Sequence, residues 1–346
     1  MAQVAVQATE TLKPAVRKHF VFLRNTKSIV GLAIFGFFLV VGLIGPWIAP
    51  YSPDKVSTAA SEPPSAIHWL GTTQTGQDIF SQLLVGTRGV MVVSISTGII
   101  ATFIAAAIGV TSGFLGGMWD EMLSMFTNIF LVIPGLPLII IIMGMMKEAG
   151  VGAIVLIISL TGWAWGARVL RSQTMSLRSR DFVEASRANG ETRFRTIFFE
   201  ILPNLTAILA STFIGTVTAS IMSLVTLSYI GVIPPSDWSW GTVLYWAQNS
   251  GAFTQGLWWW YAPAGLCVAL VGMSLALINF GIDEFVNPRL RNTGMNAAEL
   301  KKRKIYPRIG FTPVVQKAAS KSRLKTVHSS VSNSRLVASE RNNDGK

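Results

Sequence analysis

The stretch RSQTMSLRSRDFVEASRANGETRFRTIFFEILPN, residues 171–204, decides the fold, because it is polar and arginine-bearing yet lies between two long apolar segments. A chain of apolar segments has little use for so much helix-compatible polar sequence in one loop unless something outside a bilayer grips it. Loops held on a rigid scaffold commonly carry function. We therefore interpret residues 171–204 as a cytoplasmic coupling loop, where energy enters from a partner protein.

The composition around this loop is that of a multispanning membrane protein. Half of the 346 residues are hydrophobic and 13% are charged, whereas soluble domains average about 25% charged residues. A helix needs about 20 apolar residues to cross a bilayer. Six windows meet that length: 29–50, 90–114, 123–146, 152–170, 205–232 and 259–282. The predicted fold is all-α and polytopic with six transmembrane helices, and the first window is too long to be a cleaved signal peptide.

Lysine and arginine residues predict the orientation. Five precede the first window, seven lie from Arg168 to Arg195, and 14 follow the last window. Basic residues concentrate on the cytoplasmic side of a membrane protein, so both termini should be cytoplasmic. The expected regions are a cytoplasmic interfacial segment at 1–28, a transmembrane domain at 29–284 with an external loop at 51–89, and a basic cytoplasmic tail at 285–346 that we expect to be disordered.

Enzymatic, metal and cofactor chemistry is not predicted for this chain. The single cysteine, Cys267, has no partner for an internal disulfide, and the three histidines lack the spacing of metal ligands. No G-x-x-x-x-G-K-[ST] phosphate loop and no catalytic constellation are visible. The net charge of +12 comes from residues that flank the apolar windows, so we expect membrane lipid rather than nucleic acid as a partner.

The apolar windows carry no ionisable side chain at their centres, and we expect the nearest, Glu121, Arg168 and Asp283, at helix ends. A proton-coupled carrier usually needs such a group inside the membrane. This favours energy supplied by another protein, and an ATP-independent secondary carrier is the competing class. Pro134 and Pro137 interrupt the third window, either because it lines the pathway or because it packs with a kink.

Within the coupling loop the pattern predicts a helix, a bend and a second helix. Asp181 should cap a helix that begins at Phe182, and Asn189-Gly190 should end it, since both residues tolerate the left-handed conformation. The second helix should cover 191–202 and end at Pro203. Its apolar face would comprise Phe194, Ile197, Phe198 and Ile201.

Two interpretations of this loop are open. In the first, the small residues Ala185, Ser186 and Ala188 let the first helix lie in a groove of a partner while Glu184 meets a basic group. In the second, the loop is an interfacial helix held at lipid headgroups by Arg187, Arg193 and Arg195.

The loop resembles the EAA motif of ABC importer membrane subunits: Glu184-Ala185-Ser186, Gly190, then Glu200-Ile201-Leu202-Pro203-Asn204. More narrowly, the chain resembles the C-type permease subunit of dipeptide and oligopeptide importers over about residues 25–291. Several motifs in order make this likeness specific. They are His68-Trp69-Leu70-Gly71-Thr72 with Gly76 and Asp78, Gly86-Thr87-Arg88, Phe114-Leu115-Gly116-Gly117, Pro234-Pro235, Ser239-Trp240-Gly241 and Asn287-Pro288-Arg289-Leu290.

The resemblance implies a type I ABC importer permease fold in a prokaryotic inner membrane. It implies two ABC ATPase subunits that bind ATP and Mg, a second permease subunit in a heterodimer, and an extracytoplasmic solute-binding protein. Peptides are the expected solutes, with nickel or oligosaccharides as the alternatives within the family, and no substrate-binding residue is assigned. The ATPase interface would comprise Asp181, Glu184, Ala185, Ser186, Ala188 and Gly190.

Overall fold

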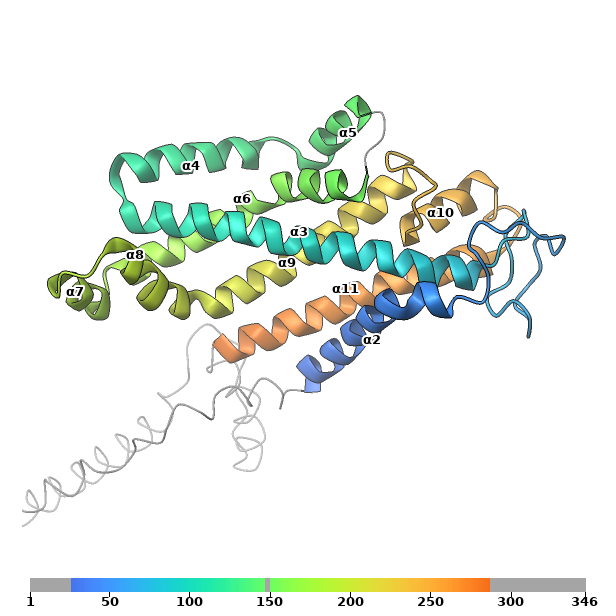
Figure 1. Ribbon diagram of the computed structural model, residues 1–346, viewed down its shortest axis with the longest axis horizontal. Helices are drawn as coiled ribbons and strands as arrows, with labels where there is room; N and C mark the ends of the chain where they lie inside the picture. Colours follow the sequence, from blue (N-terminus) through green and yellow to red (C-terminus); the bar gives the residue numbers. More distant parts are fainter. Residues whose placement is uncertain (1–25, 147–149, 287–346) are drawn as a thin grey trace, which may run out of the picture. The chain divides into compact units, whose positions relative to one another are not determined.

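The computed structural model describes residues 26–146 and 150–286, and helices account for most of these residues (Figure 1). These ranges hold no β-strand, only an isolated bridge between Thr72 and Asp78. The expected all-α fold is therefore confirmed for the described part. Most of the expected interfacial segment 1–28 and of the tail 285–346 lies outside the described residues, as does the Asn287-Pro288-Arg289-Leu290 motif.

Among the described residues, five helices are long and apolar enough to cross a membrane, and the number is six when a bent pair of helices is counted as one span. The pair is α4 and α5, whose axes differ by 81°. Pro134 is the N-cap residue of α5, so the expected break in the third window is present. The helices are α2 Thr26–Ile48, α3 Ile79–Leu115, α4 Gly117–Val132, α5 Gly135–Met145, α6 Val151–Arg178, α7 Asp181–Ala188, α8 Arg193–Arg195, the π-helix η2 Thr196–Ile201, α9 Leu202–Tyr229, α10 Trp240–Asn249 and α11 Trp258–Val286.

Two helices are longer than hydropathy predicts. The helix α3 begins at Ile79, inside the segment 51–89 expected to be a loop, because Asp78 accepts a hydrogen bond from the Ser81 amide at 2.8 Å and caps it. The helix α6 continues to Arg178, so residues 171–178 are not loop. Arg168 consequently lies within α6 and not at its end.

Small residues bring α3 and α6 into backbone contact. A Cβ atom at Gly109 would lie 2.4 Å from the Ala167 carbonyl oxygen, and one at Gly113 would lie 2.6 Å from the Arg171 carbonyl oxygen. Gly and Ala at helix interfaces allow such close approach in membrane proteins. In Figure 1 the two helices run side by side, and the ends of α3 and α6 meet near α7 and α8.

The turn from α3 to α4 uses two consecutive glycines in the left-handed region, Gly116 at φ 68° and Gly117 at φ 57°. Both conformations favour glycine, and together they make the turn tight. It brings Asp120 beneath the end of α3, where Ser112 donates to its carboxylate at 2.5 Å.

Two clusters of buried apolar side chains form the core. Within the described residues, the larger cluster joins α2, α3, α5, α6, α9, α10 and α11, and the smaller one joins α3, α6, α7, η2 and α9. The smaller cluster includes Trp163 and Leu170 of α6, Val183 of α7 and Ile201 of η2. The short helix of the coupling loop is therefore built into the core of the protein.

Candidate coupling segment

The inward face of α7 is fixed by two residues three positions apart. Val183 is fully buried against the smaller core cluster. Ser186 is 7% exposed, and its Oγ lies 3.1 Å from Thr196 Oγ1. Residues three apart share a helix face, so this face fixes how α7 lies against α6 and η2.

Ser186 is therefore not positioned as the sequence predicts. The expectation set it beside Ala185 and Ala188 on a face that meets a partner, whereas the structure buries it against Thr196. Its side chain holds α7 in place from within the subunit.

The outward face of α7 is exposed and has no partner within the described residues. Asp181, Glu184, Ala185 and Ala188 are all exposed. The Glu184 carboxylate makes no hydrogen bond or ion pair with any described residue. The two alanine side chains next to this carboxylate are short, so another chain can approach the helix backbone closely.

The start of α7 differs by one residue from the prediction. Arg180 is the N-cap residue, with φ −88° and ψ 149°, and no side chain caps the helix. Asp181 is thus the first helical residue and not the cap. With Glu184 it puts two carboxylates in the first turn, where the positive end of the helix dipole stabilises them.

The end of α7 is a Schellman motif. The Glu191 amide donates to the Ser186 carbonyl at 3.2 Å, and the Gly190 amide donates to the Arg187 carbonyl at 3.0 Å. Gly190 has φ 77°, which confirms the predicted bend. Asn189, at φ −76°, does not take the left-handed conformation.

The second helix does not end at Pro203. Thr192 caps α8, and the chain then stays helical through η2 and α9, from Arg193 to Tyr229. In η2 the Leu202 amide donates to the Ile197 carbonyl, five residues back. Such a π turn is wider than an α turn, and it precedes the proline, whose ring would clash in a regular helix.

The expected apolar face of this helix is divided in the structure. Ile201 is fully buried in the smaller core cluster, and Ile197 packs against that cluster. Phe194 and Phe198 are 68% and 48% exposed, with ring centroids 4.3 Å apart. Two apolar residues therefore hold the segment, while two aromatic rings are left on its surface.

An ion pair that the sequence does not predict braces the helices behind the segment. Arg171 of α6 binds Asp120 of α4 through two hydrogen bonds, of 2.6 and 2.7 Å, and Ser112 and Ser124 donate to the same carboxylate. Bidentate arginine–carboxylate pairs fix geometry as well as charge. The pair ties the start of α4 to the last part of α6.

The motif His68-Trp69-Leu70-Gly71-Thr72 precedes α3 in the chain and packs at the start of that helix, at the opposite end from α7. His68 Nδ1 lies 2.9 Å from Asp78 Oδ1, and the Ser81 hydroxyl donates to Asp78 Oδ2 at 2.7 Å. The side chains of His68 and Asp78 are buried. The motif folds segment 49–78 onto α3 and caps the helix.

Comparison with known proteins gives two family matches. Residues 98–292 match the model described as "Binding-protein-dependent transport system inner membrane component". Residues 19–64 match the "N-terminal TM domain of oligopeptide transport permease C". The first match contains α6, α7, α8, η2 and α9, and hence the whole candidate segment.

Curated relatives align over most of the chain. The oligopeptide transport system permease protein OppC of Mycobacterium tuberculosis is 34% identical over 274 residues, which is 78% of this chain and 93% of the relative. The OppC protein of Bacillus subtilis is 30% identical over 273 residues, covering 78% of this chain and 88% of the relative. The dipeptide transport system permease protein DppC of Bacillus subtilis is 30% identical over 272 residues, with coverage of 78% and 83%.

Proposed function

The chain belongs to the family of binding-protein-dependent transport system inner membrane components, and from that membership we propose that it forms half of the translocation pathway for dipeptides or oligopeptides in an ATP-driven importer. It is a multi-pass membrane subunit of a transport system. The peptide assignment is supported by the names of the relatives, which are oligopeptide and dipeptide permeases. They do not favour the nickel and oligosaccharide alternatives.

The proposed assembly contains this chain, a second permease subunit in a heterodimer, two ABC ATPase subunits and an extracytoplasmic binding protein. ATP and Mg would be bound by the ATPase subunits, and this chain would perform no covalent chemistry. The distribution of lysine and arginine supports an orientation with both termini and α7 in the cytoplasm and segment 49–78 outside.

One observation carries the coupling proposal: α7 is held rigidly on one face and bare on the other. Val183 and Ser186 fix its inward face. Asp181, Glu184, Ala185 and Ala188 are exposed, and Gly190 forms the bend. We assign these five residues to the ATPase interface and give Ser186 a supporting role within the subunit.

This arrangement suits the transfer of a displacement. A partner that moves α7 also moves Val183 and Ser186, which contact the smaller core cluster and Thr196. Thr196 begins η2, which continues into α9. Rearrangement of the ATPase subunits would thus tilt α9 together with α7.

The test is a charge added to the bare face of α7. In the Ala185→Arg variant we expect the ATPase subunits to be lost during purification of the assembled transporter, because a long charged side chain keeps α7 out of a groove. The matched control is Thr58→Arg, an exposed position in segment 49–78. ATPase subunits would be quantified by mass spectrometry relative to this chain.

Each outcome has a clear meaning. Loss with Ala185→Arg and retention with Thr58→Arg supports docking at α7. Equal retention in both variants refutes it. If the purified chain transports peptide in vesicles without ATPase subunits or ATP, the protein is a secondary carrier.

A further inference from the structure

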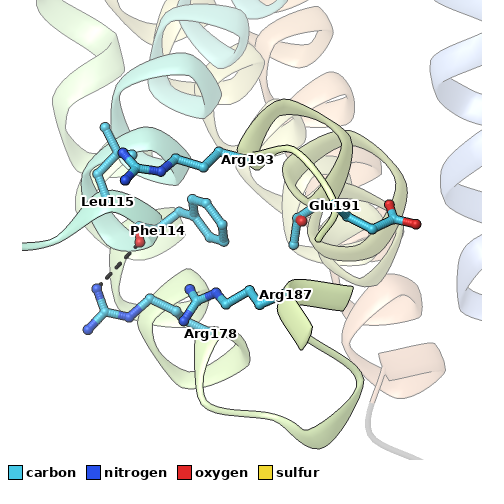
Figure 2. Close-up of a pocket in the computed structure, with 7 residues that line it drawn as sticks. Phe114, Leu115, Arg178, Arg187, Glu191 and Arg193 are labelled. Carbon is cyan, nitrogen blue, oxygen red and sulfur yellow. Dashed lines mark hydrogen bonds between the residues drawn. The ribbon is translucent and has the colours of Figure 1, made fainter. Parts of the chain in front are cut away.

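A cavity of about 490 Å³ lies between the end of α3 and the segment formed by α7 and α8 (Figure 2). Three arginines line it, each from a different element: Arg178 ends α6, Arg187 is in the last turn of α7, and Arg193 begins α8. The remaining lining residues are Phe114, Leu115, Glu191 and Thr196.

The positive charge of this cavity is not neutralised within the described part of the chain. Glu191 is the one acidic residue in its lining, and it forms an ion pair with Arg195. Figure 2 shows its carboxylate directed away from the three guanidinium groups. Among the described residues, no carboxylate pairs with Arg178, Arg187 or Arg193.

Two of the guanidinium groups are held in place by Phe114. Arg178 Nη1 donates to the Phe114 carbonyl at 3.4 Å, at the negative end of the α3 dipole. The Arg187 guanidinium carbon lies 5.2 Å from the centre of the Phe114 ring. In Figure 2 the Arg178 and Arg187 groups lie on one side of this ring and Arg193 on the other. These contacts leave several N–H donors uncommitted, in the planar arrangement that binds phosphate oxygens bidentately.

The cavity lies at one end of the apolar part of α3, where the charge pattern of the sequence sets the expected level of the lipid headgroups. No charged residue occurs between Arg88 and Asp120, so Phe114 and Leu115 lie near the end of the uncharged part of α3. Phe194, which follows Arg193 in the chain, is 68% exposed, and its ring centroid lies 4.3 Å from that of Phe198. Aromatic side chains concentrate at membrane interfaces, where an apolar body meets a polar layer.

We propose that the cavity binds a phosphate group, supplied by an anionic phospholipid headgroup or by soluble phosphate. One anion would contact α6, α7 and α8 together and relieve the repulsion among their arginines. On the proposed function, it would stiffen the coupling segment against α6, so the lipid composition of the membrane would affect coupling. Phosphate binding itself does not depend on that function.

The experiment is native mass spectrometry of the complete purified transporter in nanodiscs that contain phosphatidylglycerol or only phosphatidylcholine. The double variant Arg187→Gln/Arg193→Gln removes two of the three guanidinium groups. We expect its retention of phosphatidylglycerol to fall about 20- to 30-fold, since each basic residue near an anionic surface contributes roughly a fivefold effect. The matched control is Arg180→Gln, an exposed arginine outside the cavity lining.

A second variant distinguishes loss of the guanidinium groups from misfolding of the protein. Arg187→Lys/Arg193→Lys keeps the charges but not the planar fork, so we expect intermediate retention with normal recovery of the assembly. Inorganic phosphate at millimolar concentration distinguishes the sources. Displacement of the lipid by phosphate identifies a site for soluble phosphate, and retention of the lipid in its presence identifies a headgroup site.

Two results overturn the proposal. One is equal retention of phosphatidylglycerol by the double variant and the wild type, together with no arginine-dependent binding of inorganic phosphate. The other is loss of the ATPase subunits from the double variant with no change in lipid or phosphate binding. That result would mean that the cavity binds an acidic side chain of a partner subunit. Lipid retention is measured without transport, so the phosphate-site proposal can fail or succeed independently of the test at Ala185.

Discussion

Replacing Gly190 by valine should uncouple ATP hydrolysis from transport, because the bend after α7 depends on the left-handed conformation of this residue. Gly190 has φ 77°, and apart from its two chain neighbours no residue has an atom within 4 Å of the position a Cβ would take. The valine therefore meets backbone strain and no steric clash with neighbours. An L-residue in this conformation costs about 1–2 kcal/mol, and a β-branched one is a genuine outlier.

The strain can be relieved only by giving up the Schellman motif. That would break the bonds from the Gly190 amide to the Arg187 carbonyl and from the Glu191 amide to the Ser186 carbonyl, each worth about 1 kcal/mol net. The total cost is about 1–3 kcal/mol, which is small against a typical folding stability of about 5–15 kcal/mol. The subunit should insert and fold, with α7 turned relative to α8.

The assay is peptide uptake per ATP hydrolysed, measured in proteoliposomes that contain the complete transporter with its binding protein outside. A bias of about 1.4 kcal/mol toward the wrong orientation reduces productive coupling about tenfold. Gly190→Asn should behave nearly as the wild type, since Asn tolerates this conformation. Gly190→Ala should fall between Asn and Val.

The matched control is Gly256→Val. Gly256 has φ 73°, also has no atom within 4 Å of its Cβ position, and lies in the loop between α10 and α11, far from α7 (Figure 1). Valine at position 256 would impose the same backbone strain away from α7, so we expect coupling of ATP hydrolysis to transport to stay intact. Normal coupling in Gly190→Val, or an equal loss in Gly256→Val, would refute the reasoning.

Two further predictions concern folding, and thermal unfolding of the purified protein in detergent measures both. Gly109→Leu should lower the free energy of unfolding by about 3 kcal/mol, because its Cβ would lie 2.4 Å from the Ala167 carbonyl oxygen. Its control, Gly215→Leu, has open space around the Cβ position and should change the free energy of unfolding little. Asp78→Ala should cost about 2–4 kcal/mol, from the lost cap of α3 and an unpaired buried His68. Its control, Asp54→Ala, loses one exposed hydrogen bond and should cost less than about 1 kcal/mol. Equal losses within either pair would contradict the argument.

The membrane spans could be predicted because hydropathy sums over a whole window, but the ends of the helices could not. Capping determines where α3 starts, and the signal was present in the sequence as Asp78 followed by Ser81. The extension of α6 to Arg178 has no comparable local signal. It follows from close contact with α3, where Thr174 is buried near Gly113.

The candidate segment was predictable where its structure is local. The short helix and the bend at Gly190 depend on neighbouring residues, and both are present. The inward position of Ser186 depends on Thr196, ten residues away, so residue size alone assigned it to the wrong face. The pairing of Asp120 with Arg171 joins residues 51 positions apart, and one sequence offers many such combinations.

The helix that continues through Pro203 affects how α9 can move. The rule that proline ends a helix assumes a regular α turn before it, and the π turn of η2 removes that assumption. As a result Arg193–Tyr229 is one helical stretch of 37 residues. The third span, by contrast, is broken by 81° between α4 and α5. A displacement at α7 should therefore travel along α9 as a rigid tilt, while α4 and α5 change their mutual angle.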